Sequence, residues 1–164
     1  MIEKQGDLWT LAEGQAICIT TNPIIAYSRS QQGEVVMGRG VALQAKERFP
    51  VLPIALAARI RAEGNVPIDL GTWVHNDKMV WFRILTLPTK WDWKDASDPS
   101  LIRMSLLRLV KLVDSQAIEK TVFLPRPGCG NGRLDWKAIR PYCAELLDDQ
   151  YVIVEHETKQ GELL

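Results

Sequence analysis

Short apolar runs alternate along this chain with longer segments in which apolar residues recur every three or four positions. The apolar runs predict β-strands at residues 16–21, 71–75, 79–87, 121–124 and 151–154, with a turn at Asn76-Asp77 between the second and third. The helical period predicts α-helices at residues 38–48, 51–62, 99–113 and 135–147. The polar stretch 22–34 is predicted to be an irregular loop. Alternation of this kind is typical of an α/β domain.

The predicted helix ends agree with local residue chemistry at two places and disagree at one. Asp98 is a suitable N-cap for the long helix, and Pro99 suits its first turn. Pro50 closes the first helix. Pro141 lies inside the last predicted helix, where it lacks the amide hydrogen that the helix needs. We therefore expect a kink there or a later helix start.

The composition indicates one soluble globular domain. The chain has 164 residues and a mass of 18.5 kDa, with 46% hydrophobic and 24% charged residues. We expect a single domain over residues 1–155 and a polar tail over 156–164. Twenty basic residues balance twenty acidic ones, and no block of like charge occurs. This balance argues against a general nucleic-acid binder and against a binder of membrane surfaces.

The N-terminus lacks the basic start and apolar stretch of a secretory signal, so we expect a cytoplasmic protein. Cys18, Cys129 and Cys143 are odd in number and widely spaced, which predicts neither a disulfide framework nor a paired-thiolate zinc site. His75 and His156 do not lie at metal-ligand spacing. We expect no metal, no cofactor and a monomeric chain.

Two glycine-rich segments follow a predicted strand or precede a predicted helix. They are Met37-Gly38-Arg39-Gly40-Val41-Ala42 and Pro127-Gly128-Cys129-Gly130-Asn131-Gly132. Glycine allows close backbone approach, so such loops can direct several N–H groups at phosphate oxygens. Either loop alone could equally be a tight turn. Neither is a Walker A sequence or a full dinucleotide fingerprint, so the expected ligand carries phosphate but is not bound in either of those ways.

These loops belong to a wider set of motifs that resembles the macro domain family, whose members bind ADP-ribose. The set is Gly6-Asp7-Leu8-Trp9, Thr20-Thr21-Asn22, the first glycine loop, and the run from Leu124 to Trp136 that contains the second. The resemblance covers nearly the whole chain. Within the family the chain is most similar to the branch that contains the terminal ADP-ribose protein glycohydrolase and the antitoxin that removes ADP-ribose from DNA. Pro88-Thr89-Lys90, Trp93 and Ser97 resemble the lysine-bearing motif of that branch.

The resemblance implies a three-layer α/β/α fold with a mixed, mostly parallel central sheet, and ADP-ribose lying across the strand ends. It implies that Asp7 accepts a hydrogen bond from the adenine amine, that Leu8 offers a backbone N–H, and that Asn22 lies near the distal ribose. Without the resemblance, Asp7 would be an ordinary turn residue. The implied ligand-binding residues are Asp7, Leu8, Thr21, Asn22, Met37, Gly38, Gly40, Val41, Gly128, Cys129, Gly130, Asn131 and Gly132.

Lys90 and Asp135 fall at the catalytic positions of that branch. A deprotonated lysine amine can attack the anomeric carbon of ribose, and a carboxylate can move the protons. Without the resemblance, Lys90 would be a surface charge and Asp135 a helix N-cap. The hypothesis is therefore an ADP-ribose-binding domain that hydrolyses an ADP-ribosyl linkage on a macromolecule. The alternatives are a non-catalytic ADP-ribose reader and an ADP-ribose 1″-phosphate phosphatase.

The chain departs from the branch pattern in two places. Residues 23–36 separate Asn22 from the first glycine loop by more positions than in the DNA-directed antitoxin. Trp91 and Asp92 stand where that antitoxin has basic or imidazole side chains. Together with the zero net charge, this argues against a nucleic-acid substrate. Trp91 and Trp93 are candidates for lining the mouth of the pocket.

Overall fold

A six-stranded sheet forms the centre of the protein. The computed structural model describes residues 1–27, 31–75 and 77–156. The strand order is β1-β8-β7-β2-β6-β5, and only the β5–β6 pair is antiparallel. The strands are β1 (Ile2–Gln5), β2 (Ala16–Thr21), β5 (Asp69–His75), β6 (Val80–Pro88), β7 (Val122–Pro125) and β8 (Tyr151–Glu155). The mixed, mostly parallel sheet expected from the sequence is confirmed.

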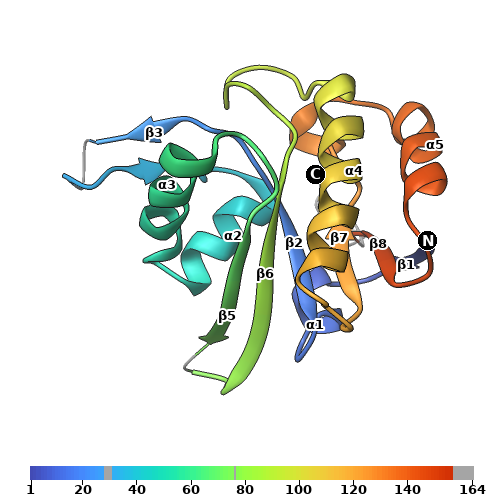
Figure 1. Ribbon diagram of the computed structural model, residues 1–164, viewed down its shortest axis with the longest axis horizontal. Helices are drawn as coiled ribbons and strands as arrows, with labels where there is room; N and C mark the ends of the chain where they lie inside the picture. Colours follow the sequence, from blue (N-terminus) through green and yellow to red (C-terminus); the bar gives the residue numbers. More distant parts are fainter. Residues whose placement is uncertain (28–30, 76, 157–164) are drawn as a thin grey trace, which may run out of the picture.

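Helices cover both faces of this sheet, which confirms the three-layer arrangement. The helices are α1 (Leu8–Leu11), α2 (Gly40–Arg48), α3 (Leu52–Glu63), α4 (Pro99–Ser115), α5 (Trp136–Leu146) and the 3₁₀ turn η1 (Gly130–Gly132). Figure 1 shows α2 and α3 on one side of the sheet and α4 and α5 on the other. Within the described part of the chain, no helix has the length and apolar character needed to cross a membrane.

Alternation within the buried strands separates two hydrophobic cores. Along β2, Ile17 and Ile19 face the core under α2 and α3, while Ala16 and Cys18 face the core under α4 and α5. The same alternation holds in β6, β7 and β8, because successive side chains of a strand point to opposite faces. Since both faces are covered, these strands are mainly apolar on both faces.

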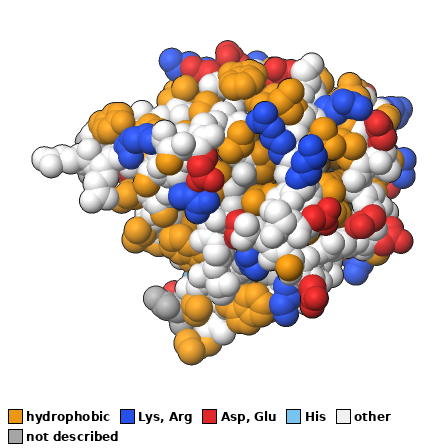
Figure 2. All heavy atoms as spheres, viewed as in Figure 1, with side chains coloured by type: hydrophobic (Ala, Val, Ile, Leu, Met, Phe, Trp, Pro, Cys, Tyr) orange, Lys and Arg blue, Asp and Glu red, His pale blue; other side chains and the backbone are white. Residues whose placement is uncertain are grey.

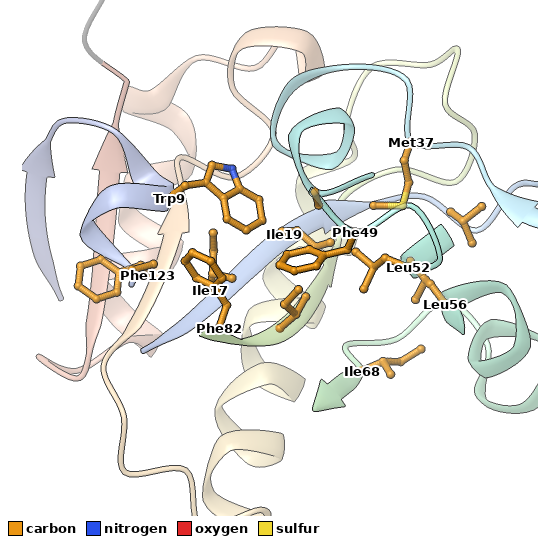
Figure 3. Packing of buried hydrophobic residues seen from close by; sticks show 14 of the residues in the cluster. Trp9, Ile17, Ile19, Met37, Phe49, Leu52, Leu56, Ile68, Phe82 and Phe123 are labelled. Atoms are coloured by element: carbon orange, nitrogen blue, oxygen red, sulfur yellow. The ribbon is translucent and has the colours of Figure 1, made fainter. Parts of the chain in front are cut away.

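Aromatic rings fill the first core near α1. Trp9 packs edge-on against Phe82 with ring centroids 5.2 Å apart, and Phe49 lies 6.4 Å from Trp9. Figure 3 shows these rings meeting Ile17 and Ile19 from the sheet. Burial of such rings at an exposed fraction of 5% or less stabilises the fold by the hydrophobic effect.

Several elements differ from the sequence prediction. The hydrophobic pattern did not indicate β1 or α1, because β1 is exposed along its length and α1 is only one turn long. The stretch 22–34 contains β3 (Ile25–Ala26), which pairs with β4 (Glu34–Val35) as a short antiparallel ribbon. The later start proposed for the last helix is wrong, since α5 begins at Trp136 and contains Pro141. Asn76 of the predicted turn and residues 157–164 of the predicted tail lie outside the described residues.

Candidate functional site

A cavity of about 770 Å³ lies at the carboxyl ends of β2, β6 and β7. Thr21 pairs with Pro88 at the last position of the β2–β6 ladder, and the next amide, of Thr89, donates to the carbonyl of Thr21 at 3.1 Å. Open α/β sheets place ligands at this edge. The lining residues are Thr20, Thr21, Asn22, Val36, Gly38, Arg39, Gly40, Val41, Ala42, Thr89, Lys90, Trp93, Lys94, Ser97, Pro125, Arg126, Gly128, Cys129, Gly130, Asn131, Gly132 and Arg133.

The first glycine loop brings the N-terminus of α2 to the cavity. Gly40 is the first residue of α2 and has a φ of +58°, which favours glycine. The N-cap residue, Arg39, makes no side-chain capping bond. The first N–H groups of a helix have no partner within the helix, and here Gly40, Val41 and Ala42 line the cavity. This end of α2 is therefore suited to receive an anion.

Ser97 packs against Gly132 of the second glycine loop. The amide of Ser97 donates to the carbonyl of Gly132 at 2.9 Å. A Cβ on Gly132 would lie 2.3 Å from Oγ of Ser97, so only glycine fits at this position. Ser97 is 5% exposed, and its Oγ has no hydrogen-bond partner among the described residues. Because this oxygen is buried against Gly132, it serves the close packing of the loop rather than contact with a ligand.

The two loops meet near Lys90. A Cβ on Gly40 would lie 3.0 Å from the side-chain nitrogen of Asn131, so the first loop approaches the second closely. The Nζ of Lys90 lies 3.4 Å from the carbonyl oxygens of both Asn131 and Trp93. Lys90 itself follows β6, and its carbonyl accepts from the side chain of Asn65 at 3.2 Å. Its amine is thus positioned at the junction of both glycine loops and the segment after β6.

The cavity is cationic. Its charged lining side chains are Arg39, Lys90, Lys94, Arg126 and Arg133, and no Asp or Glu is among the described lining residues. Arg126 is already paired with Glu155 through two bonds, at 2.8 and 3.0 Å. Figure 2 shows Lys and Arg side chains scattered among acidic and hydrophobic groups on the face it presents, without one continuous basic surface. On that face, positive charge is not gathered into the broad patch that general nucleic-acid binding requires.

The surroundings of Lys90 lower the pKa of its amine. Partial burial lowers the pKa of Lys90, and the positive charges of Arg133 and Arg39 lower it further, against an opposing effect of Asp95. Desolvation and neighbouring like charges both disfavour a protonated amine. A lysine in this setting can act as a nucleophile nearer to neutral pH than an ordinary surface lysine.

Asn22 is positioned by its own side-chain bonds. Its Nδ2 donates to the carbonyl of Val36 at 2.8 Å, and its Oδ1 accepts from the amide of Ile24 at 3.0 Å. These bonds tie the end of β2 to the base of the β3–β4 ribbon. Asn22 is 8% exposed and lines the cavity beside Thr21, so the ribbon fixes the wall at the place predicted for the distal ribose.

Three predicted ligand-binding residues lie outside the cavity lining. Asp7 is exposed and caps α1, accepting at Oδ1 from the amide and the hydroxyl of Thr10 at 2.8 and 3.0 Å. Burial raises the pKa of the Asp7 carboxyl, but the Thr10 bonds and the charge of Arg48 outweigh it, so the net pKa lies below the usual value. Leu8 is half-buried against the first core. Met37 points into that core and is 2% exposed (Figure 3), so only its backbone could reach a ligand.

Asp135 also lies outside the lining residues, whereas Lys90 is among them. The Asp135 side chain caps α5, accepting from the amide of Lys137 at 3.0 Å. Asp135 is itself exposed. Burial raises the pKa of the Cys129 thiol, Arg126 lowers it, and the charge of Asp135 raises it. The structure therefore brings Lys90 to the cavity and leaves Asp135 outside its lining.

Most of the cationic residues that line the cavity were not predicted from the sequence. Arg39, Lys94, Arg126 and Arg133 each lie within a few positions of a predicted site residue, and that adjacency was the available signal. Ser97 was part of the lysine-bearing motif but was not predicted to line the site. Its position could not be foreseen, because it depends on the segment after β6 folding back against η1.

The chain is similar in sequence to curated DNA ADP-ribosyl glycohydrolases. It is 32% identical over 105 residues to the Mycobacterium tuberculosis protein, a region that is 63% of this chain and 29% of that relative. It is 29% identical over 116 residues to the Thermus aquaticus protein, which is 69% of this chain and 31% of the relative. The chain thus matches less than a third of the length of either protein. No family model matches it.

Solved structures of the same fold cover almost the whole chain. The macrodomain of Mycobacterium tuberculosis DarG has a TM-score of 0.69 and 24% identity, over 93% of this chain and 95% of that one. The macrodomain of Thermus aquaticus DarG has a TM-score of 0.67 and 24% identity, over 96 and 97%. Thermosipho africanus DarTG in complex with ADP-ribose has a TM-score of 0.69 and 21% identity, over 98% of this chain and 43% of that one. This chain therefore has the fold of the DarG macrodomains.

Proposed function

We propose that this chain binds ADP-ribose in the cavity at the sheet edge and hydrolyses the bond between the distal ribose and a macromolecule. The observation that supports this most is the position of Lys90, whose amine lies where the two glycine loops meet. Curated relatives are named for DNA ADP-ribosyl glycohydrolase activity, and one solved neighbour is a complex with ADP-ribose.

The cavity fits a ligand of this size and charge. Its volume of about 770 Å³ lies within the range of about 300 to 1,000 Å³ that is usual for small-molecule sites. The diphosphate would lie between the N-terminus of α2 and η1, where backbone N–H groups and the charges of Arg39 and Arg133 favour it.

The proposed reaction uses Lys90 as the nucleophile. Its neutral amine attacks C1″ of the distal ribose, the bond from C1″ to the leaving group breaks, and the leaving group keeps the electron pair and takes a proton. Water then adds at C1″ and breaks the bond to Nζ, which releases ADP-ribose and restores the amine. The sum is ADP-ribosyl linkage plus water giving ADP-ribose and the protonated leaving group. In this proposal Asp135, which caps α5 outside the cavity lining, moves the protons.

The relatives' name makes DNA the first macromolecule to test. The zero net charge argues against general affinity for nucleic acid, but a substrate held by the ADP-ribose moiety needs only local cations. A reader without turnover is the second candidate. It is supported by the absence of Asp and Glu from the described residues that line the cavity.

Release of ADP-ribose tests this proposal. The wild-type chain is incubated with an ADP-ribosylated oligonucleotide, an ADP-ribosylated peptide and ADP-ribose 1″-phosphate, and free ADP-ribose is measured by chromatography. Calorimetry with ADP-ribose and with AMP is run in parallel. We expect release from a macromolecular adduct and tighter binding of ADP-ribose than of AMP, because both loops hold phosphate. Binding without release would identify a reader, and release from the 1″-phosphate alone would identify a phosphatase.

Two further properties are proposed with the function. We expect the chain to act in the cytoplasm, since Cys18, Cys129 and Cys143 are all free, as suits a reducing compartment. We also expect it to act as a monomer. Sedimentation with and without ADP-ribose would test the second expectation.

A further inference from the structure

The segment between β6 and α4 carries two exposed tryptophans next to the cavity. Trp91 is 56% exposed and Trp93 is 45% exposed. An indole gains free energy from burial, so a ring left in water at this level contributes little to folding. Trp93 lines the cavity, whereas Trp91 does not. The fold therefore holds one large aromatic surface open at the mouth of the site.

Trp93 is also adjacent to the proposed nucleophile. The Nζ of Lys90 lies 3.4 Å from the carbonyl oxygen of Trp93. A group attached to the carbon that Lys90 attacks must leave through the part of the cavity that these two residues share. The backbone of Trp93 therefore lies beside the proposed nucleophile, and Trp93 belongs to the cavity wall there.

Positive charge accompanies this ring. The Nζ of Lys94 lies over it, 5.5 Å from the ring centroid. The guanidinium of Arg133 donates to the carbonyl of Lys94 at 3.0 Å, which fastens the segment to the second glycine loop. The ring face opposite Lys94 can take a planar ring, and the lysine charge suits a phosphodiester bonded to that ring. A carboxylate or hydroxyl side chain of a protein has no ring to stack there.

We infer that Trp93 is the stacking surface for the leaving group and selects a nucleobase as that group. This inference rests on the proposed function and deepens it by assigning a residue to substrate choice. It also reconciles a neutral chain with a nucleic-acid substrate, since one stacked base and nearby cations replace a broad basic surface.

Trp91 supplies a matched control. It lies two positions away and is at least as exposed, but its Nε1 donates to Oδ2 of Asp98 at 3.0 Å. That bond turns the ring toward the start of α4. Asp98 keeps its capping bond to Ser100 through Oδ1 when Trp91 is replaced. Trp91→Ala therefore removes an equal aromatic surface from the same segment without touching the cavity lining.

The test compares two linkages in four proteins. Turnover, as kcat/KM, is measured for wild type, Trp93→Ala, Trp93→Phe and Trp91→Ala. One substrate is an oligonucleotide with ADP-ribose on a base, and the other is a peptide with ADP-ribose on a glutamate carboxyl. We expect Trp93→Ala to lose about 5- to 150-fold on the base-linked substrate, which corresponds to about 1 to 3 kcal/mol of stacking at 1.4 kcal/mol per tenfold. The loss on the carboxyl-linked substrate should be at least fivefold smaller. Trp93→Phe should recover most of the loss, and Trp91→Ala should resemble wild type.

Equal losses on both substrates would overturn the inference, because they would mean that Trp93 only positions Lys90. Preference of the wild type for the carboxyl-linked peptide would also overturn it while leaving the proposed hydrolysis intact. If the wild type turns over neither substrate, the proposed function fails. Base selection is then tested by affinity. The base-linked adduct must bind the wild type more tightly than free ADP-ribose does. Trp93→Ala must remove that difference, and equal affinities would again contradict the inference.

Discussion

Four glycines of the two cavity loops fall into two groups that their sequence does not distinguish. A Cβ on Gly128 would lie 2.6 Å from Cδ1 of Ile102, and one on Gly132 would lie 2.3 Å from Oγ of Ser97. A Cβ on Gly38 or Gly130 would meet nothing within 4 Å. The first two glycines let the second loop pack against α4 and the segment before it. The other two leave space that only a ligand would use.

Gly128 and Gly132 thus keep the loop packed, whereas Gly38 and Gly130 border the space for a ligand. Gly128 is buried and has a φ of +74°, so both its conformation and its neighbours require glycine. Gly38 is exposed, and its φ is outside the range that favours glycine. A substitution in the first group should therefore act on folding, and one at Gly38 should act on binding.

The largest effect is expected for Gly128→Ala. Strain at a positive φ and overpacking against Ile102 each cost about 1 to 3 kcal/mol, so the free energy of unfolding should fall by about 2 to 5 kcal/mol. Thermal and urea unfolding measure this. Gly64→Ala is the control, because Gly64 has a φ of +85° with open space around it and lies outside the cavity lining. If both variants are equally stable, Gly128 is not required for packing.

A smaller effect of the opposite kind is expected for Gly38→Val. Its side chain would occupy space meant for phosphate and remove charge-assisted hydrogen bonds, so binding of ADP-ribose should weaken by about 1.5 to 3 kcal/mol. The free energy of unfolding should change by less than about 1 kcal/mol. Calorimetry and melting must be measured on the same preparation. A lower melting temperature with unchanged affinity would place Gly38 with the packing glycines.

Asp7 should show an intermediate pattern. Asp7→Ala removes the cap of α1 and should cost about 1 kcal/mol of stability. Asp7→Asn keeps an oxygen for Thr10 but loses the carboxylate proposed to accept from adenine. We therefore expect Asp7→Asn to retain most of the stability and to weaken binding of ADP-ribose more than binding of ribose 5-phosphate, as calorimetry would show. Equal affinity of Asp7→Asn and wild type for ADP-ribose would leave Asp7 as a cap only.

The smallest effect is a shift in the pH dependence of turnover. Arg133 lowers the pKa of Lys90 by charge repulsion, so Arg133→Gln should raise that pKa. Because the neutral amine is the nucleophile, kcat rises with pH through this pKa, and the rise should move to higher pH in the variant. Rates are measured at saturating substrate from pH 6 to 10. Arg103→Gln, on α4 and paired with Glu145, is the control and should leave the profile in place. An unmoved profile in Arg133→Gln would mean that the titrating group is not Lys90.

The layers and most elements of the fold could be predicted because their signals are local. The apolar run of β2 and the cap at Asp98 with Pro99 gave element positions that the structure reproduces. β1 could not be predicted, since it is an exposed edge strand whose place depends on pairing with β8 at the other end of the chain. The site, too, could be predicted only in part. The glycine loops are visible as motifs, but the contacts of Ser97 with Gly132 and of Lys90 with Asn131 join residues far apart in sequence.

The most direct test of the account is the turnover and affinity of Lys90→Ala. If Lys90 attacks C1″, this variant should lose turnover by roughly 10³-fold or more, while its affinity for ADP-ribose stays within about tenfold of wild type. Lys90→Arg should not restore turnover, because a guanidinium stays protonated and cannot attack carbon. Full turnover of Lys90→Ala would contradict the account.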